Sequence, residues 1–406
     1  MRSSVRKLRG AEPVRMKIAI PRERRPNEGR VAASPETVKK FAGLGFDVVV
    51  ETGAGEGSSI PDAAFAAAGA TIAPDESAAL GDADIVLKVQ RPLTAAEGGP
   101  DEVSLMKPGA ILVGTLSALV NADQVREYAA AGITAFALEL LPRISRAQSM
   151  DVLSSQSNLA GYRAVIDAAH EFTRAFPMMM TAAGTIPPAR VIVLGAGVAG
   201  LQAIATARRL GAVVLAYDVR PAVKEQVESL GAKFVEVDAA ATGQAETAGG
   251  YAREMDTDYQ AKQERVLHEV LKKQDIAICT ALIPGRPAPV LITEAMVKDM
   301  RPGSVIVDLA VEQGGNCPLS EPGRIVVKHG VKLIGHANVP SRVAADATAM
   351  YAKNLLNFVT PLVDAESRTL AIDWTDEIIE GCLVARDGRI VHPALAGETK
   401  AAAEAR

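Results

Sequence analysis

Short runs of β-branched and other apolar residues alternate with alanine-rich segments along most of this chain of 406 residues. A first series of expected strands covers residues 17–20, 47–53, 84–89, 110–116 and 133–138, with expected helices at 62–69 and about 122–131. Another helix is expected to begin at Ser34-Pro35-Glu36, because serine is a good N-cap and proline fits the first helical position. Continuously apolar strands joined by helices are typical of a parallel sheet that helices cover on both faces.

A long helical segment, residues 153–176, precedes a second series of the same kind. Pro177 and a turn at 184–188 are expected to end this helix. The expected strands that follow cover residues 190–195, 213–218, 233–237, 275–281, 304–310 and 332–337, with helices at 198–210 and 221–230. A last helix, residues 342–358, is predicted to return the chain to the first domain.

The sequence therefore predicts an α/β fold with two Rossmann-like, doubly wound parallel-sheet domains that flank a cleft. The first domain is expected to be discontinuous, with residues 16–153 and 341–396, and the second to span 154–340. Residues 397–406 form an expected tail. Residues 1–15 form an expected basic extension, for which an alternative start at Met16, a transit peptide and an arm for an anionic surface all stay open.

Composition excludes several classes of protein. The chain has 44 Lys and Arg against 48 Asp and Glu, a net charge of −4, and only 4% aromatic residues, so we do not expect nucleic acid as a partner. The three cysteines, Cys279, Cys317 and Cys382, share no C-x-x-C spacing, which predicts neither a metal site nor a disulfide framework. No apolar run approaches the roughly 20 residues that a membrane-spanning helix needs.

The most specific motif is Gly195-Ala-Gly197-Val-Ala-Gly200, which lies between an expected strand and an alanine-rich helix. In this context Gly195 permits a tight turn, Gly197 lets the backbone approach a pyrophosphate, and Gly200 allows the helix to lie close to the strand. The N-terminus of the helix then offers N–H groups and partial positive charge to the phosphates. The motif predicts a dinucleotide site, and we include the adjacent Val198 among its contacts.

Asp218, at the end of the next expected strand, indicates which dinucleotide binds. A carboxylate at this position accepts hydrogen bonds from the ribose hydroxyls and repels a 2′-phosphate, which favours NAD(H) over NADP(H). Arg220 is the opposing signal, because an arginine near this position can accept a 2′-phosphate. We interpret Arg220 instead as a loop charge beside the adenine ring, and include Val219 and Arg220 among the cofactor contacts.

Two further segments are rich in polar or small residues. Residues 239–255 lie in an unusually long connection, which we interpret as a mobile lid with Gly250 and Tyr251 as contacts and Gln263 in the helix behind it; a surface insertion is the alternative. Residues 142–158 join the two expected domains and are crowded with Arg, Gln, Asp and Ser. Spacing alone does not separate helix caps from functional groups in this second segment.

Several long blocks resemble the soluble NAD(H)-binding component, domain I or alpha-1 subunit, of proton-translocating NAD(P)+ transhydrogenase. These blocks include PRISRAQSMDVLSSQSNLAGYRAVIDAA, TALIPGRPAPVLIT, DLAVEQGGNCPLS and GHANVPSRVAADA, and the resemblance runs from about Met16 to Ala394. It implies direct, reversible hydride transfer between NAD(H) on this chain and NADP(H) on a partner component. It also implies a membrane-spanning component that couples transfer to proton movement, a homodimer, and a cytoplasmic location peripheral to the inner membrane.

The resemblance also assigns individual residues. It implies that Arg143, Asp151 and Ser154 orient the nicotinamide carboxamide. It further implies that Gln148 reaches toward the nucleotide on the partner and that Leu282 packs on the bound nucleotide. Hydride transfer between two nicotinamides exchanges no proton with the protein, so orienting groups suffice and no general acid is expected.

Alanine dehydrogenase is the related alternative, because the chain is similar to that family over the same two-domain plan. In that family an Arg and a Lys hold the substrate and a His acts as acid and base; Arg30 and Lys88 match the first two. The His position falls at about Ser117, where this chain has no histidine, and the second catalytic Asp aligns with Glu312. We therefore interpret Arg30 and Lys88 as relics or structural ion pairs. A non-catalytic NAD-sensing module is the third possibility.

Overall fold

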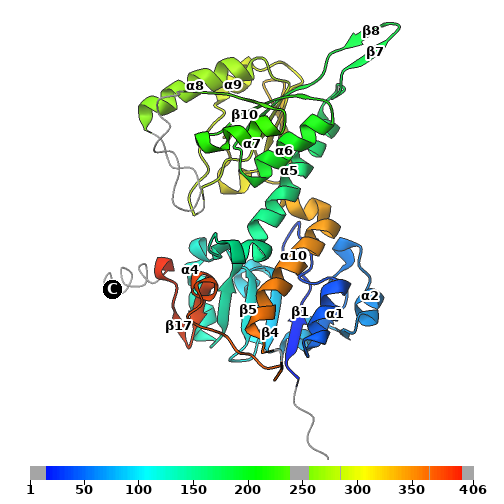
Figure 1. Cartoon of the computed structure of the whole chain (residues 1–406), viewed down its shortest axis with the longest axis vertical. Coiled ribbons are helices and arrows are strands. Elements are labelled where there is room, and N and C mark those ends of the chain that lie inside the picture. The colour runs from blue at the N-terminus through cyan, green and yellow to red at the C-terminus, as the bar shows by residue number, and fades with distance from the viewer. Residues whose placement is uncertain (1–14, 238–255, 284, 365, 396–406) are drawn as a thin grey trace, which may run out of the picture. The chain divides into compact units, whose positions relative to one another are not determined.

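The computed structural model describes residues 15–237, 256–283, 285–364 and 366–395 (Figure 1). The chain forms two compact units, and each is described by itself. Unit 1 contains the residues up to 24, 31–142 and those from 352 onward, and unit 2 contains 25–30 and 143–351. The sequence placed the divisions after residues 153 and 340, so the polar segment that begins at Arg143 falls in unit 2 in the structure.

Among the described residues, unit 1 is built on an eight-stranded sheet. In spatial order its strands are β17 (Arg389–Ile390), β16 (Leu383–Arg386), β6 (Thr134–Ala137), β5 (Ile111–Thr115), β4 (Ile85–Gln90), β1 (Lys17–Ile20), β2 (Asp47–Glu51) and β3 (Thr71–Ala73). The strands from β6 to β3 are parallel, as predicted, whereas β16 and β17 extend the sheet antiparallel. Its helices are α1 (Pro35–Gly43), α2 (Asp62–Ala67), α3 (Glu76–Leu80), α4 (Ala122–Ala130) and α11 (Glu377–Cys382).

The start of α1 confirms the sequence prediction at atomic detail. The hydroxyl of Ser34 accepts the Thr37 N–H (3.3 Å), and the hydroxyl of Thr37 accepts the Ser34 N–H (2.9 Å). Pro35 occupies the first turn, where a missing N–H costs no hydrogen bond. This reciprocal cap fixes where the helix begins.

Unit 2 contains a seven-stranded sheet within the described residues. In spatial order its strands are β11 (Lys233–Phe234), β10 (Val213–Tyr217), β9 (Arg190–Leu194), β12 (Ile276–Cys279), β13 (Val305–Asp308), β15 (Val331–Gly335) and β14 (Arg324–Lys328). All neighbours are parallel except β14, a strand that the sequence analysis did not name. The helices are α5 (Val152–Glu171), α6 (Val198–Arg209), α7 (Lys224–Ser229), α8 (Thr257–Leu271), α9 (Glu294–Asp299) and α10 (Ala344–Val359), of which α10 continues into unit 1.

Strand β9 shows how this sheet is buried on both faces. Val191 and Val193 point into a core that also contains residues of α5 and α6. Ile192 and Leu194, the alternate residues, point into a second core that contains residues of α8 and α9. Both sets are fully buried, which explains why the strand is apolar throughout.

Three local predictions were wrong. The helix expected at 153–176 ends at Glu171, and Phe172 and Phe176 beyond it pack edge to face with ring centroids 6.2 Å apart. The strand expected at 233–237 keeps only Lys233–Phe234, since it lies at the sheet edge with a single neighbour. The segment predicted as a turn around 184–188 forms a hairpin, β7 (Met179–Thr181) and β8 (Gly184–Ile186), whose residues are all exposed and so carry no alternating pattern.

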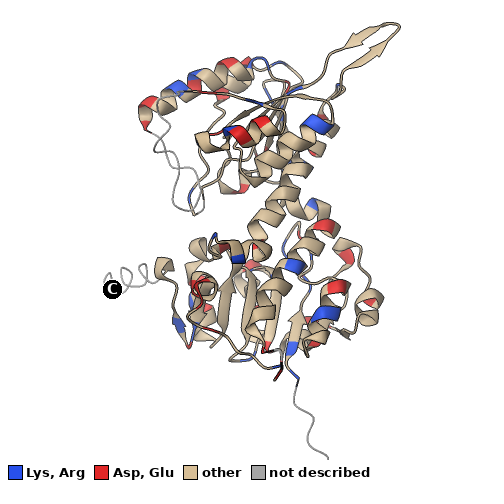
Figure 2. Ribbon diagram, in the orientation of Figure 1, with Lys and Arg blue, Asp and Glu red and all other residues tan. Residues whose placement is uncertain are grey.

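Charged residues are interspersed over both units, with blue and red side by side along most helices (Figure 2). The described chain contains no helix that is long and apolar enough to cross a membrane.

Candidate nucleotide site in unit 2

The glycine loop between β9 and α6 has a separate structural reason for each of its three glycines. Gly195 has a φ of +97°, and a Cβ there would lie 2.7 Å from the Thr280 hydroxyl. A Cβ on Gly200 would lie only 1.8 Å from the Gly195 carbonyl oxygen, so this glycine permits the close packing of helix on strand. A Cβ on Gly197 would meet no atom within 4 Å. The first and third glycines are required by the fold, and the second faces open space.

The N-terminus of α6 is suited to an anion. Gly197 is its N-cap residue, and no side chain caps the helix there. Val198, the first helical residue, is 41% exposed, so the first turn is accessible. Unsatisfied N–H groups at a helix N-terminus, together with the helix dipole, favour phosphate oxygens. A pyrophosphate therefore fits the loop that the sequence singled out.

Asp218 is tied to this loop and carries its own counter-ion. Its Oδ2 accepts the Ala196 N–H at 2.7 Å, which joins the end of β10 to the glycine loop. The Arg220 guanidinium binds the same carboxylate, with Nε at 2.9 Å from Oδ1 and Nη2 at 2.9 Å from Oδ2. Arg220 is only 14% exposed at its side chain, so the interpretation of a solvated loop charge was wrong. Val219, between them, packs against the core on the α8 side of the sheet.

The loop after β12 approaches the glycine loop from the next strand. The Thr280 N–H donates to the Leu194 carbonyl (2.8 Å), and its hydroxyl donates to the Gly195 carbonyl (2.9 Å). Leu282 follows two residues later and is half-buried. Sequence reasoning missed Thr280; its place directly after an apolar strand, at the carboxyl edge of a parallel sheet, is the signal that could have found it.

The structure gives Gln263 a packing role. It is buried on α8, and its Oε1 accepts the Tyr217 hydroxyl at 2.9 Å, beside the Tyr259 hydroxyl. Burial, together with the hydrogen bond from Tyr259, raises the pKa of Tyr217, so this phenol stays protonated. Contact of Gln263 with a nucleotide stays a prediction. Gly250 and Tyr251 lie outside the described residues.

The polar segment before α5 is partly explained by helix capping. Asp151 is the N-cap of α5, and its carboxylate accepts both the N–H (2.9 Å) and the hydroxyl (2.5 Å) of Ser154. Gln148 lies in a short 3₁₀ turn, Ser145–Met150, and is exposed, as is Arg143. The structure thus pairs two of the four residues assigned by resemblance and leaves the other two at the surface of unit 2.

Arg30, which matches a substrate-binding position of alanine dehydrogenase, lies in an ion pair. Its guanidinium binds Glu28 (2.6 Å) and donates to the side-chain oxygens of Gln156 (2.8 Å) and Asn338 (3.0 Å). All of these residues belong to unit 2. The interpretation of Arg30 as part of a structural ion pair is confirmed.

Lys88 is also held internally, in unit 1. It is 1% exposed, with Nζ 2.6 Å from Glu102 and 3.4 Å from Glu23. Burial opposes its charge, but the two carboxylates outweigh burial and raise the pKa of Lys88. Ser117, where alanine dehydrogenase has its histidine, has a φ of +49°. The neighbouring N–H groups of Leu116 and Ala118 are accepted by Glu139.

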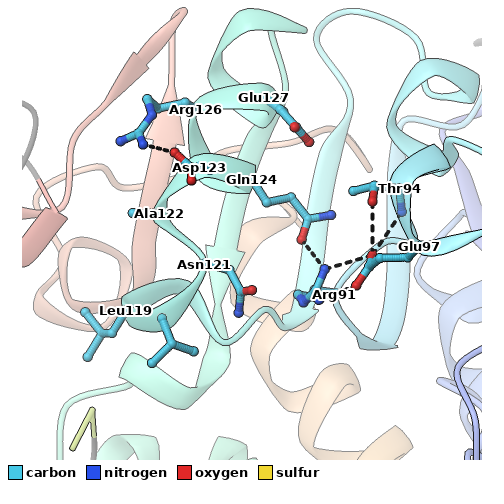
Figure 3. Close-up of a pocket in the computed structure, with 11 residues that line it drawn as sticks. Arg91, Thr94, Glu97, Leu119, Asn121, Ala122, Asp123, Gln124, Arg126 and Glu127 are labelled. Carbon is cyan, nitrogen blue, oxygen red and sulfur yellow. Dashed lines mark hydrogen bonds and ion pairs between the residues drawn. The ribbon is translucent and has the colours of Figure 1, made fainter.

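No other described group offers a competing chemical site. Cys279, Cys317 and Cys382 are buried as free thiols, and burial raises their pKa values, so none is a ready nucleophile. No cluster of metal-binding side chains occurs among the described residues. A pocket of about 570 Å³ in unit 1 is polar (Figure 3), but Arg91, Glu97 and Gln124 in its wall are hydrogen-bonded to one another.

Comparison with known proteins identifies the family. The sequence matches the model of the alanine dehydrogenase/PNT N-terminal domain over residues 19–160 and that of the C-terminal domain over residues 164–393. This chain belongs to the alanine dehydrogenase/PNT family. The family match and the solved structures that the chain resembles confirm the predicted α/β fold class.

Individual relatives place it closer to one branch. An NAD(P) transhydrogenase subunit alpha chain of Rhodospirillum rubrum, named as one of the pieces into which that subunit is divided, is 68% identical over 383 residues, 94% of this chain and 100% of the relative. A transhydrogenase structure from Sinorhizobium meliloti has a TM-score of 0.83 and 51% identity, covering 92% of this chain and 100% of that chain. An alanine dehydrogenase of Halomonas elongata is 31% identical, over 94% of this chain and 96% of the relative. The resemblance to transhydrogenase, and the relation to alanine dehydrogenase, are confirmed.

Proposed function

We propose that this chain binds NAD(H) at the glycine loop of unit 2 and transfers hydride directly and reversibly to NADP(H) on a partner subunit. The assembly is a proton-translocating transhydrogenase. One observation carries the proposal most strongly: an uncapped helix N-terminus behind an open Gly197, with Asp218 bonded to the same loop. The first feature fits a pyrophosphate, and the second lies where an adenosine ribose is recognised.

Asp218 supports NAD(H) rather than NADP(H) as the bound nucleotide. Its carboxylate can accept hydrogen bonds from ribose hydroxyls, and it holds the Arg220 guanidinium that could otherwise bind a 2′-phosphate. The internal ion pair thus removes the signal that favoured NADP(H). Val198, Val219 and Leu282 complete the proposed contacts in the described residues.

The bound nicotinamide supplies the hydride, so the protein has only to hold it in place. We assign orientation of the carboxamide to Arg143, Asp151 and Ser154, and contact with the partner's nucleotide to Gln148. The hydrogen bonds between Asp151 and Ser154 support this assignment, because they fix two of the polar groups before any ligand binds. Gly250, Tyr251 and Gln263 are assigned to the closing side of the site.

The proposed partners are an NADP(H)-binding component, a membrane-spanning component and a second copy of this chain. The name of the Rhodospirillum relative, which makes it one piece of subunit alpha, supports a divided assembly. Through these partners the chain would lie on the cytoplasmic side of the inner membrane.

Alanine dehydrogenase activity is the second candidate, favoured by the family match. Against it, Arg30 and Lys88 are bound by internal carboxylates, and Ser117 offers no proton donor tuned near neutral pH. A non-catalytic NAD-sensing module is the third.

The first experiment is NADH binding by the purified chain, followed by fluorescence, and then NADH consumption with pyruvate and ammonium. We expect binding without consumption, and NADH oxidation only when the NADP(H)-binding component and NADP+ are supplied. Consumption by the chain alone would make it a dehydrogenase in its own right. Binding with no transfer to a competent partner would leave the sensing module.

A further inference from the structure

Asn316 is a fully buried amide at the carboxyl edge of the sheet in unit 2. Its Oδ1 accepts the Ala281 N–H (3.1 Å), and its Nδ2 donates to the Ala281 carbonyl (2.9 Å). The same Nδ2 donates to the Pro289 carbonyl (2.8 Å). One side chain therefore binds both polar groups of Ala281 and joins them to a residue further along the same connection.

Asn316 is itself fixed by the strand next to it. Asp308, the last residue of β13, is fully buried and accepts the Asn316 N–H (3.2 Å) and the Cys317 N–H (3.0 Å). The Asn316 carbonyl accepts the N–H groups of Leu291 (2.9 Å) and Ile292 (3.0 Å). These bonds leave the amide little freedom, so it acts as a rigid bracket for the peptide at Ala281.

That peptide lies against the glycine loop. A Cβ on Gly195 would lie 3.0 Å from the Ala281 nitrogen and 3.2 Å from its Cα. Thr280, on the other side, donates its hydroxyl to the Gly195 carbonyl. The segment is thus held from two directions, by Thr280 toward the glycine loop and by Asn316 toward β13, and Leu282 is the next residue along the chain.

We infer that Asn316 is a positioning residue for the nucleotide: it sets the distance between the glycine loop and Leu282, and so the width of the site between them. This inference rests on the proposed function. Without the amide, the Ala281 and Pro289 carbonyls and the Ala281 N–H lose partners in a buried place, and the segment moves to find others. The nucleotide then loses contacts although Asn316 never touches it.

The test compares Asn316→Ala with Gln124→Ala, each of which removes one buried amide. Gln124 in unit 1 donates to the Pro92 carbonyl (2.7 Å) and accepts from Arg91 (2.8 Å), so it too holds a loop (Figure 3). We expect the thermal midpoint to fall in both variants. We expect the Kd for NADH, followed by nucleotide fluorescence, to rise about tenfold in Asn316→Ala and to stay at the wild-type value in Gln124→Ala.

Thr280→Val supplies a milder variant that keeps the side-chain shape. We expect it to raise the Kd for NADH severalfold with little change in thermal midpoint. Because Thr280 and Asn316 act on the same segment, the double variant should raise the Kd by less than the product of the two single effects. The emission of NADH at saturation should also differ from that of the wild type in both single variants.

The outcomes separate the inference from the proposed function. Absence of NADH binding by the wild-type chain contradicts the proposed function itself. If the wild type binds NADH, and folded Asn316→Ala binds it equally well, the positioning role is overturned while the proposed function stands. Independent effects in the double variant, or an equal rise in Gln124→Ala, would reduce Asn316 to a residue that only stabilises the fold. If Asn316→Ala does not fold, unchanged binding by Thr280→Val overturns the role.

Discussion

At the scale of single residues, the pairing of Asp218 with Arg220 changes how the nucleotide motif is understood. The motif places a carboxylate at the end of β10, but the structure shows that this carboxylate is already bound by a guanidinium and by the Ala196 N–H. Its negative charge is therefore largely balanced before any ligand binds. Selectivity against a 2′-phosphate then depends on Asp218 holding Arg220 as much as on direct repulsion.

Asp218→Asn tests this interpretation. The amide keeps one acceptor but loses the charge that holds Arg220, which becomes available to a 2′-phosphate. We expect the Kd for NADH to rise about tenfold and the Kd for NADPH to fall, so that the preference narrows. Titration of both nucleotides by fluorescence measures this, with far-UV circular dichroism as the folding control. Unchanged binding of both would show that the proposed nucleotide pose is wrong.

At the scale of elements, the carboxyl ends of the parallel strands in unit 1 collect charged groups in a buried place. Glu51 ends β2 and Lys88 lies in β4, while Glu76 begins α3 and Glu102 lies in a 3₁₀ turn. Arg24 joins them, with its guanidinium bound to Glu51 and, at 3.0 Å, to Glu76. Carboxylates outnumber cations, so one of them has reason to hold a proton.

Glu76 is the group on which that proton is expected. Burial, and then the charge of Glu102, raise the pKa of Glu76 to about 7, against the opposing charges of Arg24 and Lys88, with Glu51 adding a smaller rise. The folded state therefore binds this proton more tightly than the unfolded state, in which the pKa of the glutamate is near its ordinary value of 4.5. The contribution is fully present below about pH 4.5 and is lost as the pH rises through about 7.

Glu76→Gln should therefore flatten the pH dependence of stability. At pH 8 we expect the variant to be more stable than the wild type, by on the order of 2 kcal/mol, and at pH 5 to be similar. Urea unfolding at several pH values measures the difference. Glu36→Gln, which changes an exposed carboxylate paired with Lys40, is the control and should show no such crossover. Parallel wild-type and Glu76→Gln curves would refute the assignment.

At the scale of the whole molecule, the proposed reaction needs a second nucleotide that another chain supplies. Gln148 suits a contact with that chain, because it is exposed on unit 2 and lies in the segment just before the capped start of α5. Its side chain carries an amide rather than a charge, so it can contact a nucleotide without adding a charge to the site. The relation to a chain named as one piece of subunit alpha supports the same arrangement.

Gln148→Asn shortens this side chain by one methylene. We expect the Kd for NADH to stay within about twofold of wild type and the rate of transfer to partner-bound NADP+ to fall about tenfold, because hydride transfer depends on distance. Fluorescence titration and stopped-flow absorbance of the reconstituted complex measure the two. Gln226→Asn, at an exposed position on α7, is the matched control. Equal losses in binding and transfer would place Gln148 in the NADH pocket instead.

The layers of this protein follow from local patterns in its sequence. Buried parallel strands must be apolar on both faces, and that pattern marked every parallel strand of unit 2, while capping residues marked the helix start at Ser34. Local pattern also located the glycine loop, since close packing at Gly200 and the turn at Gly195 leave no room for other residues. Short antiparallel edge strands such as β14 and β16 escaped, because edge positions impose weaker patterns.

Which polar groups satisfy one another is settled by the tertiary structure alone. The pairing of Asp218 with Arg220, of Lys88 with Glu102, and of Asn316 with Ala281 joins side chains to partners that spacing does not reveal. A buried polar group must find a partner, but the identity of that partner depends on three-dimensional proximity. For this reason the sequence could place Arg30 and Lys88 at substrate-binding positions, while the structure shows their charges bound within the protein.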